Sequence, residues 1–191
     1  IAAHGHADAL SFLLHIDGQP VLVDSGTYTY HTEAEWRNYF IGTLAHNTIR
    51  VNRLNQAKIG GSTLWLQHYN CRVLNAETGS EIDIVKAKHD GYKRLGIAHT
   101  REIIFDKKSL QIKIIDSIES TKNESYFIEL PFHVHPAIKV QAFDEHAFGL
   151  INNNGRNIRL QADQKLTTQL VCGQLDPEII GWYSESFLHK E

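Results

Sequence analysis

The chain opens with His4-Gly5-His6-Ala7-Asp8-Ala9-Leu10-Ser11-Phe12-Leu13-Leu14-His15-Ile16-Asp17-Gly18-Gln19-Pro20-Val21-Leu22-Val23-Asp24, and this stretch decides how the fold begins. Every even position of residues 10–16 is apolar, which is typical of a strand with one buried face. Asp17-Gly18 separates this run from a second apolar run that ends at Asp24, and this arrangement predicts a tight β-hairpin. The hairpin would bring its ends together, with His4 and His6 across from Asp24.

A further strand pattern begins just after His46, within Ala45-His46-Asn47-Thr48-Ile49-Arg50-Val51. If this strand meets the hairpin at the same end, His6, Asp24 and His46 gather two imidazoles and one carboxylate. This is a common ligand set for zinc and other divalent metals. Each residue alone is explained as well by a polar position at a strand end. The hypothesis of a metal or proton-transfer site therefore rests on their occurring together, in a chain that has 12 His among 191 residues.

Composition is that of an ordinary globular protein. Hydrophobic residues make up 42% and charged residues 21% of the chain, enough for a substantial core. The net charge of −3 provides no basic surface, so neither nucleic acid nor an anionic membrane is an expected partner. No run of about 18 apolar residues occurs, and no transmembrane helix is predicted. Cys71 and Cys172 do not have metal-site spacing and are expected to be free thiols or one disulfide.

One short helix is predicted over residues 32–40. Trp36, Tyr39 and Phe40 have helical spacing there, and Thr32 with Glu35 has the spacing of a capping box. This helix would carry Arg37 toward the edge that holds Asp24 and His46.

Strand patterns dominate the remainder of the chain. Turn residues separate short apolar runs at 48–51, 63–67, 71–75, 81–87, 100–106, 110–117, 126–132, 137–142, 148–151, 157–161 and 167–172. Residues 55–62 and 86–92 are predicted loops, residues 152–155 a hairpin turn, and residues 181–187 a closing aromatic strand. Without linkers or repeats, this pattern predicts an all-β fold, an antiparallel β-sandwich with one short helix in a single domain over residues 1–191.

Motifs spread along the chain resemble the heparinase II/III-like family of polysaccharide lyases. They are His4-Gly5-His6-Ala7-Asp8, Asp24-Ser25-Gly26-Thr27-Tyr28-x-Tyr30, Arg37-x-Tyr39-Phe40, Ala45-His46-Asn47-Thr48 and Asn55-Gln56, with weaker similarity at Arg101, Asp116, His133-Val134-His135-Pro136 and Gly181-Trp182-Tyr183-Ser184. The resemblance covers only that family's C-terminal half. It implies a β-sandwich that stacks on an N-terminal α/α-toroid domain, which this chain does not contain, with the active-site cleft between the two. Because the chain has no Met and opens directly on its richest motif, we expect it to be a piece of a larger protein.

The resemblance also implies a role for the clustered residues. His6, Asp24 and His46 match positions that hold a zinc ion, which we expect to be structural because it would tie the hairpin to the strand after Ala45. His4 matches a histidine that faces the cleft and takes part in substrate handling or proton transfer. From their chemistry, the substrate-binding candidates are Tyr28, Tyr30, Arg37 and Tyr39, since Arg clamps carboxylates and Tyr stacks on sugar faces.

The predicted function of the parent protein is cleavage of a uronate-containing acidic polysaccharide by β-elimination. The family's main tyrosine acid/base and its Asn or His helper lie in the toroid, so we expect the isolated chain to be inactive. One alternative is a non-catalytic glycan-binding or scaffold module, and another is a cupin-like metal enzyme, whose His-x-His motif His4-Gly5-His6 imitates. Family members are mostly bacterial and exported, which implies a periplasmic or secreted location. The sequence leaves the identity of the glycan open.

Overall fold

The predicted hairpin is present but short. In the computed structural model, which describes residues 2–191, β1 (Leu14–Ile16) pairs antiparallel with β2 (Gln19–Leu22). Asp17 and Gly18 form the turn with positive φ values of 51° and 75°, as a type I′ turn requires. Ile1, the first residue of the predicted 1–191 domain, lies outside the described residues.

Residues 10–13 were predicted to extend the first strand, and this prediction is wrong. Side chains from distant segments bind the backbone here, in place of a neighbouring strand. The Asn47 amide donates to the Phe12 carbonyl at 2.9 Å, and an Arg101 guanidinium nitrogen donates to the Leu10 carbonyl at 2.7 Å. These contacts satisfy the backbone without a sheet partner, so the chain takes an irregular path with a φ of 62° at Leu10.

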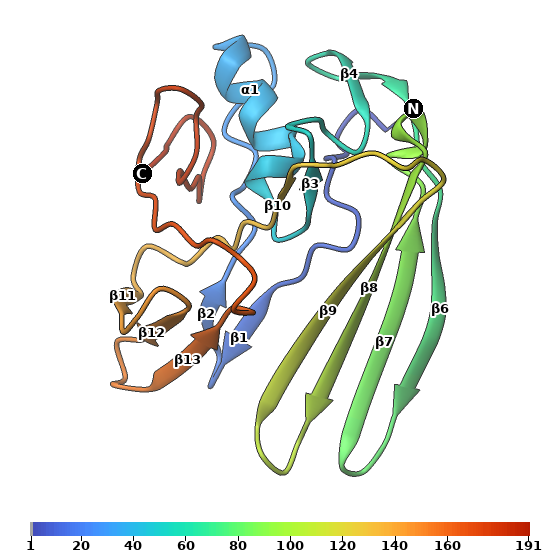
Figure 1. Cartoon of the computed structure of the whole chain (residues 1–191). Coiled ribbons are helices and arrows are strands. Elements are labelled where there is room, and N and C mark those ends of the chain that lie inside the picture. The colour runs from blue at the N-terminus through green and yellow to red at the C-terminus, as the bar shows by residue number, and fades with distance from the viewer. Residues whose placement is uncertain (1) are drawn as a thin grey trace.

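The largest sheet is a four-stranded antiparallel meander in the order β6-β7-β8-β9. Its strands are β6 (Cys71–Thr78), β7 (Ile82–His89), β8 (Ile97–Asp106) and β9 (Gln111–Ser120). In Figure 1 these strands extend downward from the end of the molecule where the N-terminus lies, and α1 and β4 lie at that same upper end. The predicted loop at 86–92 is wrong for residues 86–89, which continue β7 because they pair with β8 as far as His89 opposite His99.

The remaining strands form three smaller antiparallel sheets. They are β3 (Arg50–Val51) with β10 (Ile128–Glu129), β4 (Lys58–Gly61) with β5 (Leu64–Gln67), and β11 (Lys139–Ala142) with β12 (Ala147–Ile151) and β13 (Asn157–Gln161). The turn at 152–155 joins β12 to β13 as predicted. The predicted loop at 55–62 contains β4, and residues 167–172 and 181–187 contain no strand; Ser184 makes only an isolated bridge to Gly26.

The predicted short helix is α1 (Ala34–Ile41), followed by a 3-10 turn at Thr43–Ala45, and a second 3-10 turn lies at Lys93–Leu95. The predicted capping box is wrong: Glu33 is the N-cap residue, with a φ of 50° and no capping hydrogen bond from its side chain. The Glu33 carboxylate instead accepts a hydrogen bond from the Tyr28 hydroxyl at 2.7 Å. Antiparallel sheets with one short helix confirm the predicted all-β class.

Both cysteines are exposed free thiols. None of the helices described for residues 2–191 has the length and apolar character needed to cross a membrane.

A chain of buried polar side chains joins the large sheet to the N-terminal segment. The guanidinium of Arg101 binds both carboxylate oxygens of Asp116, at 2.8 and 3.0 Å. His99 donates to Asp116 at 2.6 Å and lies 2.9 Å from His89, whose other ring nitrogen accepts the Gly91 backbone N–H. This last bond places the His89 proton on Nε2, so all four ring nitrogens of His89 and His99 have a partner while both imidazoles are neutral.

Acid should therefore destabilise the protein partly through His89. Burial, with the nearby His99, lowers the pKa of His89 from 6.5 to about 3, so the unfolded chain takes up a proton more readily than the folded one. The stability that His89 contributes is complete above about pH 6.5 and declines toward pH 3, by up to about 1.4 kcal/mol per pH unit. In urea unfolding between pH 7 and 4.5, His89→Gln should start less stable and lose less on acidification. The control is His15→Gln, at an exposed position, which should keep the pH dependence of the wild type. If His89→Gln also keeps the wild-type pH dependence, His89 does not contribute to the loss of stability in acid.

Candidate metal centre and adjoining pocket

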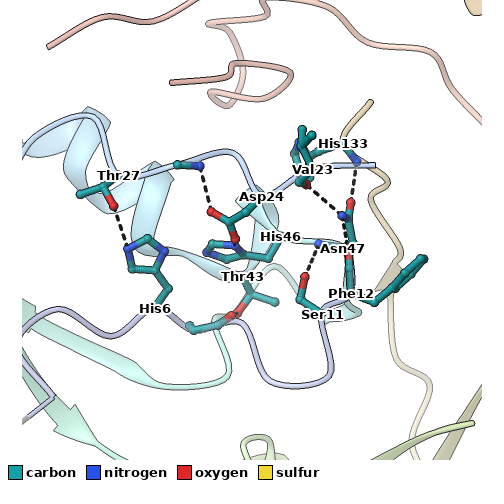
Figure 2. A network of polar contacts seen from close by, with 12 residues as sticks. His6, Ser11, Phe12, Val23, Asp24, Thr27, Thr43, His46, Asn47 and His133 are labelled. Atoms are coloured by element: carbon teal, nitrogen blue, oxygen red, sulfur yellow. Dashed lines mark hydrogen bonds and ion pairs between the residues drawn. The ribbon is translucent and has the colours of Figure 1, made fainter. Parts of the chain in front are cut away.

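The three residues predicted to bind a metal come together. The ligand atoms of His6, Asp24 and His46 all lie within 4.8 Å of one another. Figure 2 shows that they come from three separate segments: the irregular chain before β1, the chain just after β2, and the chain just after the 3-10 turn at Thr43–Ala45. The rings of His6 and His46 are 5.1 Å apart. The three side chains therefore lie together, and their role as metal ligands stays a prediction.

His46 is the most constrained member of the group. Its side chain is fully buried, and its Nδ1 donates to an Asp24 carboxylate oxygen at 2.7 Å. Its Nε2 is also buried and has no hydrogen-bond partner. A buried ring nitrogen without a partner is costly, and a bound cation would satisfy it. This orphaned nitrogen, in a set of two imidazoles and one carboxylate, shows that the residues present fit a zinc ion.

The ionisation states of the other two residues also suit a metal. Burial, followed by the charge of His46, lowers the pKa of His6 to about 4, so its imidazole is neutral at neutral pH and free to ligate. Burial acts to raise the pKa of Asp24, but the hydrogen bond and charge of His46, the hydrogen bond from the Gly26 N–H and the nearby His6 together outweigh it and hold the pKa below its usual value. The other Asp24 oxygen accepts the Gly26 backbone N–H at 2.9 Å. The cluster thus presents one carboxylate and one neutral imidazole beside His46.

A pocket of about 610 Å³ opens beside this cluster. Its lining includes His4, His6 and Asp24, together with Ala2, Gly5, Asp8, Thr27, Ala57, Trp65, His68 and Tyr69. His4 is exposed here, and its ring makes a T-shaped contact with the Tyr30 ring, with 5.2 Å between the ring centres. The structure therefore separates His4, at the pocket surface, from His6, which belongs to the metal cluster. A larger depression, of about 840 Å³, is lined by residues 144–146, 159 and 161–165 and contains none of the predicted site residues.

Sequence reasoning missed three lining residues, Trp65, His68 and Tyr69. The Trp65 indole donates to the Ala2 carbonyl at 3.0 Å, and the Tyr69 hydroxyl donates to the His6 carbonyl at 3.4 Å. They belong to β5 and the residues after it, and both bonds fix the segment that carries His4 and His6. The available signal was two aromatic residues with a His between them, but nothing local connected them to a segment about 60 residues away.

The four predicted substrate-binding residues divide into two pairs. Tyr30 and Arg37 lie together near His4, with the Arg37 guanidinium 4.7 Å from the centre of the Tyr30 ring. Tyr28 and Tyr39 are buried in an aromatic cluster with Phe40, and their hydroxyls bind Glu33 and the Trp182 carbonyl. A glycan contact for any of the four stays a prediction, and Tyr28 and Tyr39 would need this cluster to open.

Comparison with known proteins provides independent evidence for the family to which the chain belongs. Residues 1–189 match the family model described as heparinase II/III-like, C-terminal. The chain is 26% identical over 162 residues to a heparin-sulfate lyase of Bacteroides stercoris, covering 83% of the chain and 22% of that protein. It is 24% identical over 190 residues to a heparin-sulfate lyase of Bacteroides thetaiotaomicron (95% and 25%), and 25% identical over 147 residues to an exo-oligoalginate lyase of Saccharophagus degradans (71% and 19%). The chain therefore spans about a quarter of the length of the curated relatives that it matches.

Solved structures agree on the fold. A heparinase III superposes with a TM-score of 0.75 at 19% identity, over 97% of this chain and 26% of that one. The heparan sulfate lyase HepC of Pedobacter heparinus superposes with a TM-score of 0.72 at 18% identity, over 98% and 27%. The predicted β-sandwich is thereby confirmed. With a family model that matches nearly every residue, the chain belongs to the heparinase II/III-like family and corresponds to its C-terminal domain.

Proposed function

We propose that this chain is the C-terminal domain of a lyase that cleaves a uronate-containing polysaccharide by β-elimination. The observation that carries the proposal is the cluster of His6, Asp24 and His46, with its orphaned Nε2, beside a pocket lined by His4. The matched relatives are named heparin-sulfate and exo-oligoalginate lyases, so the proposed substrate is an acidic glycan. Since a polymer of this kind does not cross a membrane unaided, a periplasmic or secreted location is part of the proposal.

The proposed metal is zinc in a structural role. His6, Asp24 and His46 would hold the ion, which when bound would supply a fixed positive charge linking the hairpin to the chain after α1. Full burial of His46 supports a structural role, because the ring cannot move toward a substrate without opening the core. The segment that carries His4 would then be fixed in two ways: the metal would hold the His6 side chain, and the hydrogen bonds from Trp65 and Tyr69 hold the backbone at Ala2 and His6.

The reaction makes three demands, and this chain has groups for part of them. Elimination requires neutralisation of the uronate carboxylate, a base for the C5 proton and an acid for the departing oxygen. The exposed His4 imidazole at the pocket surface can take up or donate a proton. The remaining groups would come from an N-terminal toroid domain, in keeping with a chain that spans about a quarter of its relatives.

A glycan-binding module without catalysis is the second candidate, favoured by the aromatic lining of the pocket. Ultraviolet absorbance of the unsaturated uronate product separates the two. We expect full-length protein to release it from heparan sulfate or alginate, and the isolated chain to release none. Binding by full-length protein without any product would establish the module instead. The cupin-like alternative is wrong, since the family match assigns the chain elsewhere.

Metal analysis tests the cluster directly. We expect purified protein to carry zinc close to one ion per chain and His46→Ala to lose it. The variant would lack both the Nε2 atom that would bind the ion and the Nδ1–H that binds Asp24. A chelator should lower the melting temperature, since a ligand at a hundredfold excess over its dissociation constant stabilises the native state by roughly 2.7 kcal/mol. His15→Ala, at an exposed position, should change neither result. Unaltered zinc content in His46→Ala would remove the proposed site.

His4 and His6 should fail in different ways, although they are two residues apart. In full-length protein, His4→Ala should keep its metal and melting temperature but lose about 100- to 10,000-fold in turnover, as expected for a positioned proton-transfer group. His6→Ala should lose the metal and melt earlier. Loss of zinc in His4→Ala, or unchanged turnover, would contradict this division of roles.

A further inference from the structure

Arg37 is a buried cation, and no anionic partner for it occurs among the described residues. Three arginines of residues 2–191 are almost fully buried, and their exposed fractions are nearly equal: 2% for Arg37, 3% for Arg50 and 2% for Arg101. Arg50 pairs with Glu129 and Glu178, and Arg101 pairs with Asp116. Among residues 2–191, no carboxylate lies within ion-pair distance of Arg37. Its Nε donates to the Ser62 carbonyl at 2.9 Å, and its buried Nη1 has no partner at all.

Such an arrangement is costly unless something else compensates the charge. Burying a guanidinium removes its hydration, and proteins normally restore the loss with a carboxylate, as this fold does twice. A planar guanidinium also offers two parallel N–H donors, a geometry that suits carboxylate and sulfate groups. The unused donors of Arg37 therefore point to an anion that the chain itself does not supply.

The surroundings place this anion site next to the candidate active site. The Arg37 guanidinium lies over the Tyr30 ring, and Tyr30 also makes a T-shaped contact with the ring of His4, which lines the pocket. Ser62 belongs to the turn between β4 and β5, so this bond ties α1, which carries Arg37, to that hairpin, and both elements lie at the upper end of the molecule in Figure 1. Tyr30 also stacks with Phe187, with 6.3 Å between the ring centres, so its ring is held in place beside Arg37.

We propose that Arg37 and Tyr30 form a subsite for the anionic group, carboxylate or sulfate, of an acidic saccharide bound in the adjoining pocket. This rests on the proposed function for the identity of the saccharide, but not for the presence of the anion site. Arg37 provides the charge and the fork of donors, and Tyr30 holds the guanidinium plane in position. The subsite is separate from the metal cluster, since none of its residues belongs to that group.

The test uses the chain itself with small probes: glucuronate, inorganic sulfate and uncharged glucose, at constant ionic strength. We expect glucuronate or sulfate to shift the Nε–Hε resonance of Arg37 in NMR spectra and to raise the melting temperature, and glucose to do neither. A response to glucuronate alone assigns a carboxylate, and a response to both assigns a general anion site. If neither anion shifts the Arg37 resonance in the wild-type chain, the proposal is overturned, whatever the variants do.

Variants separate this site from the rest. Arg37→Met should weaken the anion response by about 10- to 100-fold, as expected when a charged hydrogen-bonding group is lost, and Arg37→Lys should recover only part of it. Arg53→Met is the matched control, because Arg53 is exposed and also lies near an aromatic ring, 5.7 Å from the centre of Phe127. Zinc content should be unchanged in all three. An anion response that survives in Arg37→Met overturns the proposal. The absence of zinc from the wild-type chain, or of lyase activity from the full-length protein, would contradict the proposed function and leave the anion site standing.

Discussion

The structure depends on Asn47, whose side chain replaces sheet pairing at the point where four segments meet. Its amide donates to the carbonyls of Phe12 and Val23, both at 2.9 Å, and its side-chain oxygen accepts the His133 backbone N–H, as Figure 2 shows. A buried backbone group without a partner costs roughly 1–3 kcal/mol, so a single fully buried amide that satisfies three of them is hard to replace. Because His46 precedes Asn47 directly, the same bonds also position the backbone that carries His46, one of the three candidate metal ligands.

The irregular path of residues 10–13 allows the side chains of His4 and His6 to point to different places. A strand that continued from β1 toward His6 would have carried both histidines along a regular pleat, with their side chains on one face. Side-chain bonds from Asn47 and Arg101 release this segment from the sheet. The chain can then bend so that His6 joins Asp24 and His46 while His4 remains at the pocket surface.

Buried charge is used in two ways in this fold. Arg50 and Arg101 are paired with carboxylates, and these pairs connect β3 to β10 and β8 to β9. Among residues 2–191, five buried side chains instead keep an unpartnered polar atom, and His46 and Arg37 are two of them. Because an unpaired buried donor or ring nitrogen destabilises the ligand-free fold, these two atoms are the ones on which the proposed cation and anion sites rest.

The sequence by itself determined the features that are encoded locally: the Asp17-Gly18 turn, the short helix that carries Arg37, the strands of the meander, and His6, Asp24 and His46 as candidate ligands. Turn chemistry and alternating hydrophobicity depend only on neighbouring residues, so they can be read directly. Only the tertiary structure decided that residues 10–13 leave the sheet, that Trp65 and Tyr69 support the histidine segment, and that Arg37 has no carboxylate. Each of these depends on hydrogen bonds or charges between residues tens of positions apart, and no local pattern specifies which distant group will satisfy a buried donor.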